Sequence, residues 1–437
     1  MRYFVKVFIF TILNIFLFAG LSRAEKVTFV KEYTYQASEL DSKASCRTIS
    51  LEMVKRLLLE ELGTYLISET EVKNMQLTKD QVTTYSAGIV SAEVIDEKWD
   101  GKTYWLKAKV SADPKEVSKS LKKIIDDRFQ AKQLEDSRKK AEELIKENER
   151  LRKEIKAIAK SKKRDTKAQA KKVKDYEKTI RWLNAIEWFN KGNSAILVGR
   201  YNEAINAMNK ALEIQPDLAS AYIVHGYAYN LLGNYQQAIK DFSKAIELKP
   251  DYAEAYVLRG YVYNDLVNYK QAIKDFSKAI ELKPNIALAY DGRGRAYMGL
   301  GTYLHYQQAI EDFGKAIELM PDLTEAYVVR GGANNVLGNY QQAIKDFNKA
   351  IELKPDLAAA YVGRGSVYND LGNYQQAIKD FNKAIELKPD LAVAYYERGV
   401  AYGHVGAYQQ AIADLRIAAR LGIKGAQNVL IEIGEQW

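Results

Sequence analysis

The chain has 437 residues, of which 47% are hydrophobic and 28% are charged, and its formal net charge is +9. This composition is ordinary for soluble globular protein, and it excludes both wholesale disorder and a membrane protein with many spans. The length corresponds to roughly two or three domains. The excess charge is local, because residues 1–24 contribute +3 and residues 160–181 contribute +7, which leaves the rest of the chain nearly balanced.

Residues 1–24 have the features of a secretory signal peptide. Arg2 and Lys6 form a positive start, residues 7–21 are mostly apolar, and small residues precede a cleavage site after Ala24. We expect cleavage there and an exported protein of the periplasm or of a bacterial-type cell envelope. An uncleaved membrane anchor is the alternative, and only in that case do we expect the protein to contact a membrane.

Residues 25–112 are predicted to form a small α+β domain. The patterning indicates a strand at Lys26–Tyr35, a helix at Ser42–Tyr65, and a hairpin of strands at Ala87–Lys98 and Thr103–Ser111. One face of the helix is apolar and is expected to pack on the sheet through Leu51, Val54, Leu58 and Leu62.

The plan of this domain resembles the small domains of the N-terminal type in flagellar assembly protein T. The helix reads ASCRTISLEMVKRLLLEELGTYL and the last strand reads TYWLKAKVSA. The resemblance implies an envelope-associated assembly module. The only cysteine of the chain, Cys46, lies in the helix, so no internal disulfide forms. We expect a small buried residue there, with an intermolecular bridge as the alternative.

A long helix is predicted over residues 113–159, with Asp113 as its N-cap and Pro114 in its first turn. It fits a heptad pattern, and an Asn at position a flanked by Leu at d is typical of a parallel two-stranded coiled coil. We therefore expect a homodimer, with a lone helix packed on the rest of the protein as the alternative. The predicted dimer stripe has Leu134, Ala141, Asn148 and Ile155 at position a, and Ser137, Leu144, Leu151 and Ile158 at position d.

Residues 160–184 are predicted to be a basic helical connector. Between 160 and 181 there are ten Lys or Arg residues and a single aromatic residue, Tyr176. Strips that bind single-stranded nucleic acid interleave basic with aromatic residues, so we expect no nucleic-acid partner. A solvated helix is one interpretation, and contact with anionic envelope polymer or lipid headgroups is the other.

From Ala185 the sequence repeats every 34 residues through seven units that end at residue 423, and residues 424–434 are predicted to cap them. The units begin at Ala185, Ala219, Ala253, Ala287, Thr324, Ala358 and Ala392. Position 8 is always glycine, at Gly192, Gly226, Gly260, Gly294, Gly331, Gly365 and Gly399. Positions 20 and 27 are always alanine, position 4 is always aromatic, and position 32 is proline in six units.

This pattern resembles the tetratricopeptide repeat (TPR) family. The resemblance implies a mainly α-helical solenoid of helical hairpins, in which small residues allow two helices to approach closely. A Gly-Asn-Tyr turn or a variant of it separates the two helices of each unit. The sequence departs from the family pattern at Ala195 and Asn334, in three extra residues around Tyr303–Tyr306, and at Ile423, which replaces the last proline.

Positions 5, 9, 12 and 13 of each first helix share one side at about 100° per residue. The resemblance makes this side the concave groove, and regularly spaced amides can pair with a peptide backbone. We expect a protein or peptide partner to bind there, although the asparagines could instead cap their helices. The candidate binding residues are Asn230, Asn264, Asn335, Asn369, Tyr227, Tyr261, Val257, Val328 and Val362.

Two further ladders run along the repeats. Arginine recurs at position 7, at Arg259, Arg293, Arg330, Arg364 and Arg398. These side chains point away from the groove, and pairing with acids on the neighbouring helix is expected, with an anion-binding row as the alternative. Lys-Asp pairs recur on the second helices and are expected to form a solvated face, at Lys240-Asp241, Lys274-Asp275, Lys345-Asp346 and Lys379-Asp380.

Sequence signals for catalysis are missing. The three histidines lie in separate units, no Cys or His cluster suits a metal, and no phosphate-binding or dinucleotide-binding fingerprint occurs. We therefore expect no cofactor and a non-enzymatic interaction scaffold. The alternative is an N-terminal domain that binds envelope polymer or carries out hydrolysis under the control of the repeats.

Overall fold

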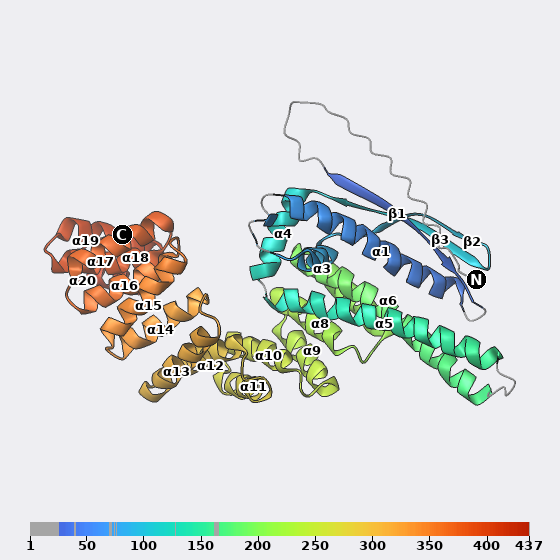
Figure 1. Ribbon diagram of the computed structural model, residues 1–437. Coiled ribbons are helices and arrows are strands. Elements are labelled where there is room, and N and C mark those ends of the chain that lie inside the picture. Colours follow the sequence, from blue (N-terminus) through green and yellow to red (C-terminus); the bar gives the residue numbers. More distant parts are fainter. Residues whose placement is uncertain are drawn as a thin grey trace, which may run out of the picture. The chain divides into compact units, whose positions relative to one another are not determined.

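The computed structural model describes residues 26–38, 41–69, 72–73, 75, 77–126, 128–160 and 166–436. The predicted signal peptide lies outside these residues. The chain forms two compact units that divide after Arg200, and each is described here by itself (Figure 1). The predicted boundary before Ala185 falls inside a continuous helix, so the first helix of the first repeat belongs to the N-terminal unit.

A three-stranded antiparallel sheet forms one layer of the N-terminal unit. Its strands are β1 (Val27–Gln36), β2 (Glu93–Trp99) and β3 (Thr103–Ala112), in the order β1-β3-β2. The predicted hairpin is present as β2 and β3. At its turn Gly101 has a φ of +88°, a left-handed conformation that glycine adopts readily.

Helix α1 (Lys43–Ser68) covers one face of this sheet (Figure 1). The predicted apolar face is confirmed, since Leu51, Val54, Leu58 and Leu62 are all buried in the core with alternate residues of β3. Cys46 is also buried, as expected. Burial raises the pKa of its thiol to about 11, which keeps it protonated and unreactive at neutral pH.

Helix α3 (Lys79–Ile89) was not predicted from the sequence. A capping box begins it, because the Thr78 hydroxyl accepts from the Gln81 amide while the Gln81 side chain accepts from the Thr78 amide. The predicted strand at Ala87–Lys98 is therefore too long at its start, and β2 begins only at Glu93. Helix α3 lies against α1, where Gly63 leaves room for it.

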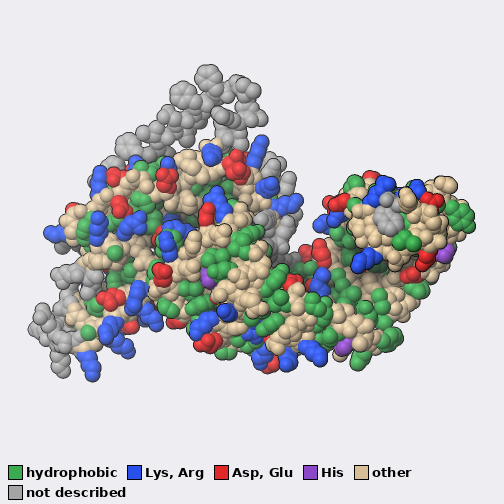
Figure 2. All heavy atoms as spheres, turned by 180° about the vertical axis from the view of Figure 1, so that it is seen from behind, with side chains coloured by type: hydrophobic (Ala, Val, Ile, Leu, Met, Phe, Trp, Pro, Cys, Tyr) green, Lys and Arg blue, Asp and Glu red, His purple; other side chains and the backbone are tan. Residues whose placement is uncertain are grey.

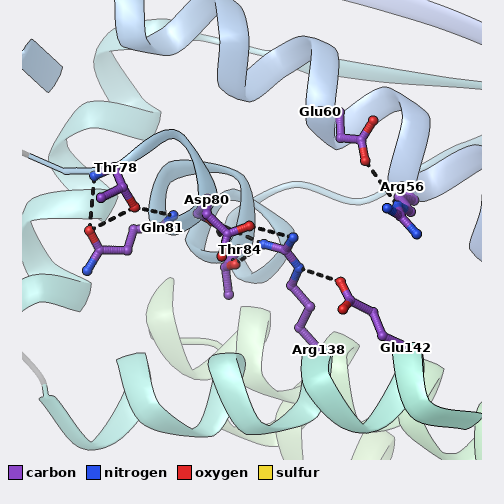
Figure 3. Close-up of polar contacts among 8 residues, drawn as sticks. All are labelled: Arg56, Glu60, Thr78, Asp80, Gln81, Thr84, Arg138 and Glu142. Atoms are coloured by element: carbon purple, nitrogen blue, oxygen red, sulfur yellow. Dashed lines mark hydrogen bonds and ion pairs between the residues drawn. The ribbon is translucent and has the colours of Figure 1, made fainter.

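The predicted long helix is described as α4 (Pro114–Asp126) and α5 (Arg128–Lys160). Arg138 fastens α5 to α3 (Figure 3). Its guanidinium pairs with the Asp80 carboxylate at 2.6 Å and with Glu142 at 3.1 Å, and it also donates to the Thr84 hydroxyl. The contacts with Asp80 and Thr84 hold α5 against α3, while the Glu142 pair lies within α5 itself.

Helix α6 (Thr166–Leu197) is the partner of α5, and the two form an antiparallel hairpin. Ser137 Oγ bonds to Asn190 Oδ1 at 2.7 Å, and Asn148 Nδ2 donates to Thr179 Oγ1 at 3.1 Å. Leu144 packs against Leu183 in the same interface. The stripe that we assigned to a parallel dimer thus packs inside one chain.

The rest of the heptad stripe supports this correction. Leu151 and Ile155 are almost fully buried, and Ala141 and Ile158 are half-buried. The side chain of Leu134 lies outside the described part. A second chain could use this stripe only if α6 left it, so the structure does not support the coiled-coil dimer.

The C-terminal unit is an array of helical hairpins closed by α20, as the repeat pattern predicts. Its helices are α7 (Tyr201–Ile214), α8 (Ala219–Leu231), α9 (Tyr235–Leu248), α10 (Ala253–Asp265), α11 (Tyr269–Leu282), α12 (Ala287–Leu300), α13 (Tyr303–Leu319), α14 (Thr324–Val336), α15 (Tyr340–Leu353), α16 (Ala358–Asp370), α17 (Tyr374–Leu387), α18 (Ala392–His404), α19 (Tyr408–Arg420) and α20 (Lys424–Glu432).

The recurring small residues allow the close packing that the sequence predicts. A Cβ atom added to Gly260 would lie 2.9 Å from the Phe276 ring, so only glycine fits between these helices. The alanines at positions 20 and 27 of the array are buried, for example Ala272 and Ala279. Each hairpin therefore has its own small core, and stacking joins neighbouring cores.

Candidate functional site

The array is curved, with its first helices on the inside. We call α8, α10, α12, α14, α16 and α18 the first helices, and α9, α11, α13, α15, α17 and α19 the second helices. Neighbouring first helices approach one another more closely than neighbouring second helices do. The inner face is the side of the first helices that carries positions 2, 5, 6, 9, 12 and 13 of the repeat.

The predicted asparagine ladder lies on the inner face, but most of its amide groups bridge neighbouring repeats. Asn264 Nδ2 donates to the Gly292 carbonyl at 3.0 Å. Asn369 Nδ2 donates in the same way to the Glu397 carbonyl at 3.2 Å, and Asn335 Nδ2 donates to Asp370 at 3.0 Å. These three side chains bond to the following unit rather than capping their own helices. Among the described residues, the Oδ1 atoms of all four asparagines have no hydrogen-bond partner, so their role in peptide binding stays a prediction.

Of the predicted tyrosine and valine residues, some are buried in the packing of the array and others are partly exposed on its inner face. The Tyr261 hydroxyl donates to the Leu288 carbonyl at 2.9 Å, and its ring meets the Phe276 ring edge-on at 5.2 Å. Burial raises the pKa of Tyr261 well above its usual value. Val257 is buried, whereas Tyr227, Val328 and Val362 are half-buried on the inner face. A role for these residues in peptide binding remains a prediction.

The inner face is most accessible at position 13, which the sequence placed on this side but from which we chose no candidate binding residue. Leu231 is 40% exposed and Val336 is 60% exposed. The equivalent residues of the third and sixth units, Asp265 and Asp370, are also exposed. Hydrophobic side chains reach the surface over much of the array, with charged side chains beside them (Figure 2). The sequence could have indicated this, because position 13 varies between apolar and acidic residues from unit to unit, as a surface position does.

The arginine ladder is structural. Arg259 donates from Nε and Nη2 to the two carboxylate oxygens of Asp275, at 2.7 and 2.9 Å, and its Nη1 reaches Ser243 of the preceding unit at 2.9 Å. The same bidentate pair recurs at Arg293–Asp312, Arg330–Asp346, Arg364–Asp380 and Arg398–Asp414. The predicted pairing is confirmed, and these guanidinium groups are not available as an anion-binding row.

The Lys-Asp pairs of the second helices do not form a uniformly solvated face, so that prediction is wrong for the acids. Asp275, Asp346 and Asp380 are buried, because each accepts the arginine of its own unit. In the second unit His225 takes the place of the arginine, and its Nδ1 lies 2.9 Å from Asp241 Oδ2. We did not anticipate this replacement.

A cluster of polar side chains lies in the core of the N-terminal unit. The Asp41 carboxylate, fully buried, accepts from Arg152 Nη2 at 2.9 Å, from the Ser38 amide at 2.6 Å and from the Tyr176 hydroxyl. The Arg152 guanidinium also lies 4.6 Å from the centre of the Tyr35 ring. A cavity of about 300 Å³ borders this cluster. Tyr176, the single aromatic of the basic run, is thus a core residue.

The described residues were also compared with the requirements of a metal site and of a membrane-spanning helix. No group of three or more His, Cys, Asp or Glu side chains among them could hold a metal ion. Within the same ranges, no helix combines the length and the apolarity needed to span a bilayer.

These features define a class of protein, the helical-repeat solenoid. Two-helix units of 34 residues stack one on the next. Small residues and aromatic rings recur at fixed positions of the units, and the contacts between them hold the units together. Profiles described as TPR repeat match residues 226–267, 336–371 and 365–406, and profiles described as tetratricopeptide repeat match 253–286 and 185–218. The chain is a tetratricopeptide repeat protein, and its repeats imply a protein–protein interaction scaffold.

Several solved structures are similar to this chain. YrrB, described as a TPR protein with an unusual peptide-binding site, is 27% identical over 44% of this chain and 97% of its own, with a TM-score of 0.38. MamA is 30% identical over 38% and 96%, with a TM-score of 0.34. A TPR protein from Parabacteroides merdae is 22% identical over 57% and 96%, with a TM-score of 0.45. No curated protein matches this sequence.

Proposed function

We propose that the protein is an exported scaffold of the cell envelope that binds a peptide or protein partner on the inner face of its array. The observation that carries this proposal is the exposure of position 13. Leu231 and Val336 lie at this position and are exposed, and neither belongs to the buried core. Exposed apolar side chains spaced one repeat unit or more apart suit an extended partner that contacts several units in turn.

Export is supported by the sequence of residues 1–24, which combines a positive start, an apolar stretch and small residues before Ala24. The N-terminal unit then serves as a separate module that precedes the array in the chain. Its resemblance to the small domains of flagellar assembly protein T supports a role in envelope assembly. Dimerisation through α5 is not part of this proposal, because α6 covers the heptad stripe.

Affinity capture from a native envelope extract tests the proposal. One bait is the chain without its signal peptide, and a second carries Leu231→Ser and Val336→Ser. The control bait carries Leu353→Ser and Ile417→Ser, which change two exposed apolar residues of second helices. We expect a protein retained by the first and control baits and lost from the second. Equal capture by all three baits would contradict binding on the inner face.

A further inference from the structure

The first helices carry cations that are paired with acids, and several acids that are not paired with a cation. Every position-7 arginine is bonded to a buried aspartate, and Arg295 pairs with Asp291 at 2.7 Å. In the described part of the chain, no ion pair joins a cation to four carboxylates of these helices, Asp265, Glu325, Asp370 and Glu397. Glu325 lies within the electrostatic reach of Arg295, which leaves the other three.

The second helices show the opposite balance. Glutamates near the ends of these helices are paired, as in Lys278–Glu281 at 2.6 Å and Lys383–Glu386 at 2.7 Å, whereas no ion pair among the described residues includes Glu311 of α13. Among the described residues, the lysines that no ion pair joins to an acid include Lys240, Lys274, Lys345 and Lys379. Apart from Glu311, carboxylates of these helices without an ion pair thus lie on the inner face, and lysines without an ion pair lie on the second helices.

Two of these carboxylates, Glu397 and Asp265, have lost part of their hydration. Burial raises the pKa of Glu397, and the nearby charge of Asp370 adds to this, while a hydrogen bond from Asn369 acts in the opposite direction. Burial also raises the pKa of Asp265. A carboxylate that loses water without gaining a cation is in a costly state, and a cation supplied by a ligand would relieve it.

We propose that the inner face binds a basic segment of a partner protein, with lysine or arginine side chains opposite Asp265 and the Asp370–Glu397 pair and apolar side chains opposite Leu231 and Val336. This inference rests on the proposed function, since it names the chemistry of the segment that the same face takes. Charge complementarity selects the partner, and the exposed apolar positions contribute contact area.

The repeat sets the expected spacing of the basic residues. Packed helices lie about 8–10 Å apart and an extended chain advances about 3.3 Å per residue, so one repeat corresponds to roughly three ligand residues. Asp265 and Asp370 occupy equivalent positions three units apart. Their cationic partners should then be roughly nine ligand residues apart.

Three pools of fluorescent dodecapeptides test the proposal against the full chain. Every third position is fixed as Lys in one pool, Gln in the second and Glu in the third, and the other positions are random. We expect the Lys pool to bind about tenfold more tightly than either other pool, and to lose much of this preference as salt rises to about 0.3 M. Preference for Gln or Glu, no binding, or a preference insensitive to salt would overturn the proposal.

A pair of charge-matched variants locates the effect. The variant Asp265→Asn/Asp370→Asn/Glu397→Gln should bind the Lys pool about tenfold more weakly than the unchanged chain. The control variant Glu281→Gln/Glu352→Gln/Glu386→Gln removes the same charge from second helices and should bind within about twofold of it. Equal weakening by both would overturn the proposal, because it would reflect net charge alone.

The two proposals fail separately. If the Gln or Glu pool binds best and the Leu231→Ser/Val336→Ser variant loses that binding, the inner face is a binding site but its charge class is wrong. If partner capture is insensitive to the inner-face substitutions, the proposed function itself fails. Circular dichroism of each variant confirms that the fold is retained before either conclusion is drawn.

Discussion

Arg364 and Asp380 are joined by two parallel hydrogen bonds, of 2.8 Å from Nε to Oδ2 and 2.7 Å from Nη2 to Oδ1. The pair links the first helix of a unit to the second, and Arg364 Nη1 also reaches Asn348 of the preceding unit at 2.6 Å. The guanidinium lies 5.6 Å from the centre of the Tyr361 ring. Arg259, Arg293 and Arg398 reach the preceding unit in the same way, so each of these arginines joins three helices and charge inside the array maintains its geometry.

Removing the acid of such a pair should be costly. Asp346→Ala leaves Arg330 without its carboxylate in a mostly buried site, and the expected loss of unfolding free energy is about 3–5 kcal/mol. Chemical denaturation followed by circular dichroism measures it. Glu352→Ala removes an exposed acid that pairs with Lys349, and it should cost under about 1 kcal/mol. Similar losses for both would show that the buried pairs do not hold the repeats together.

Val267 is predicted to be strained. It has a φ of +60°, in the left-handed region where the other hairpin turns place glycine, for example Gly338 at +76°. A β-branched residue pays about 1–2 kcal/mol for this conformation. Val267→Gly should therefore raise the unfolding free energy by about 1 kcal/mol, and Gly338→Val should lower it by a similar amount or more. Destabilisation by Val267→Gly would contradict this account.

Two glycines of neighbouring helices should respond oppositely to alanine. A Cβ atom at Gly363 would lie 2.3 Å from the Phe347 ring, so Gly363→Ala should destabilise the array by about 1–3 kcal/mol. Gly332 has open space around its Cα, and Gly332→Ala should stabilise helix α14 by about 0.5–1 kcal/mol. Thermal melts of the two variants give the sign directly, and a matching sign would show that the packing is misdescribed.

The ionisation of Glu397 should make the stability of the array depend on pH. Because burial raises its pKa in the folded protein, the protonated form is favoured there and stability is lost as pH rises above the ordinary value. Glu397→Gln should thus be more stable than the unchanged chain at about pH 7, and this advantage should shrink towards about pH 4. Denaturation midpoints at several pH values test this, and an advantage independent of pH would refute it.

The α5–α6 hairpin can be trapped covalently. Ser137 and Asn190 are in side-chain contact, so Ser137→Cys/Asn190→Cys should form a disulfide within one chain on mild oxidation. The natural Cys46 is buried and should not compete. Non-reducing electrophoresis would show a monomer, and the control Lys139→Cys/Asn190→Cys, with an exposed first site, should not close the loop. Covalent dimers of the first variant would instead support the parallel coiled coil.

The repeat fold could be predicted because the residues that pack the two helices of a unit together all lie within one 34-residue pattern. Gly260 and Phe276 recur at fixed positions, so their contact could be expected from periodicity alone. Contacts between units could not be predicted in this way. Asn264 and Tyr261 bond to the following unit, and no pattern inside a single unit shows how far the next helix lies from them.

The heptad stripe was correctly predicted to be buried, but its partner was misassigned. Helix α6 resembles a solvated connector by composition, yet Val173, Tyr176, Ile180 and Leu183 recur at helical spacing and give it an apolar stripe of its own. The buried Asp275 was misjudged for a related reason. Adjacent residues lie about 100° apart on a helix, so Lys274 faces outward while its neighbour faces the arginine of the first helix.

Photocrosslinking in the cell tests the central claim most directly. A photoreactive amino acid at Val336 lies on the inner face, and one at Ile417 lies on a second helix. The account predicts that irradiation joins a partner protein to the chain labelled at Val336, that this partner carries a basic segment at the crosslink, and that the Ile417 label does not capture it. Capture of the same partner from Ile417, with none from Val336, would contradict it.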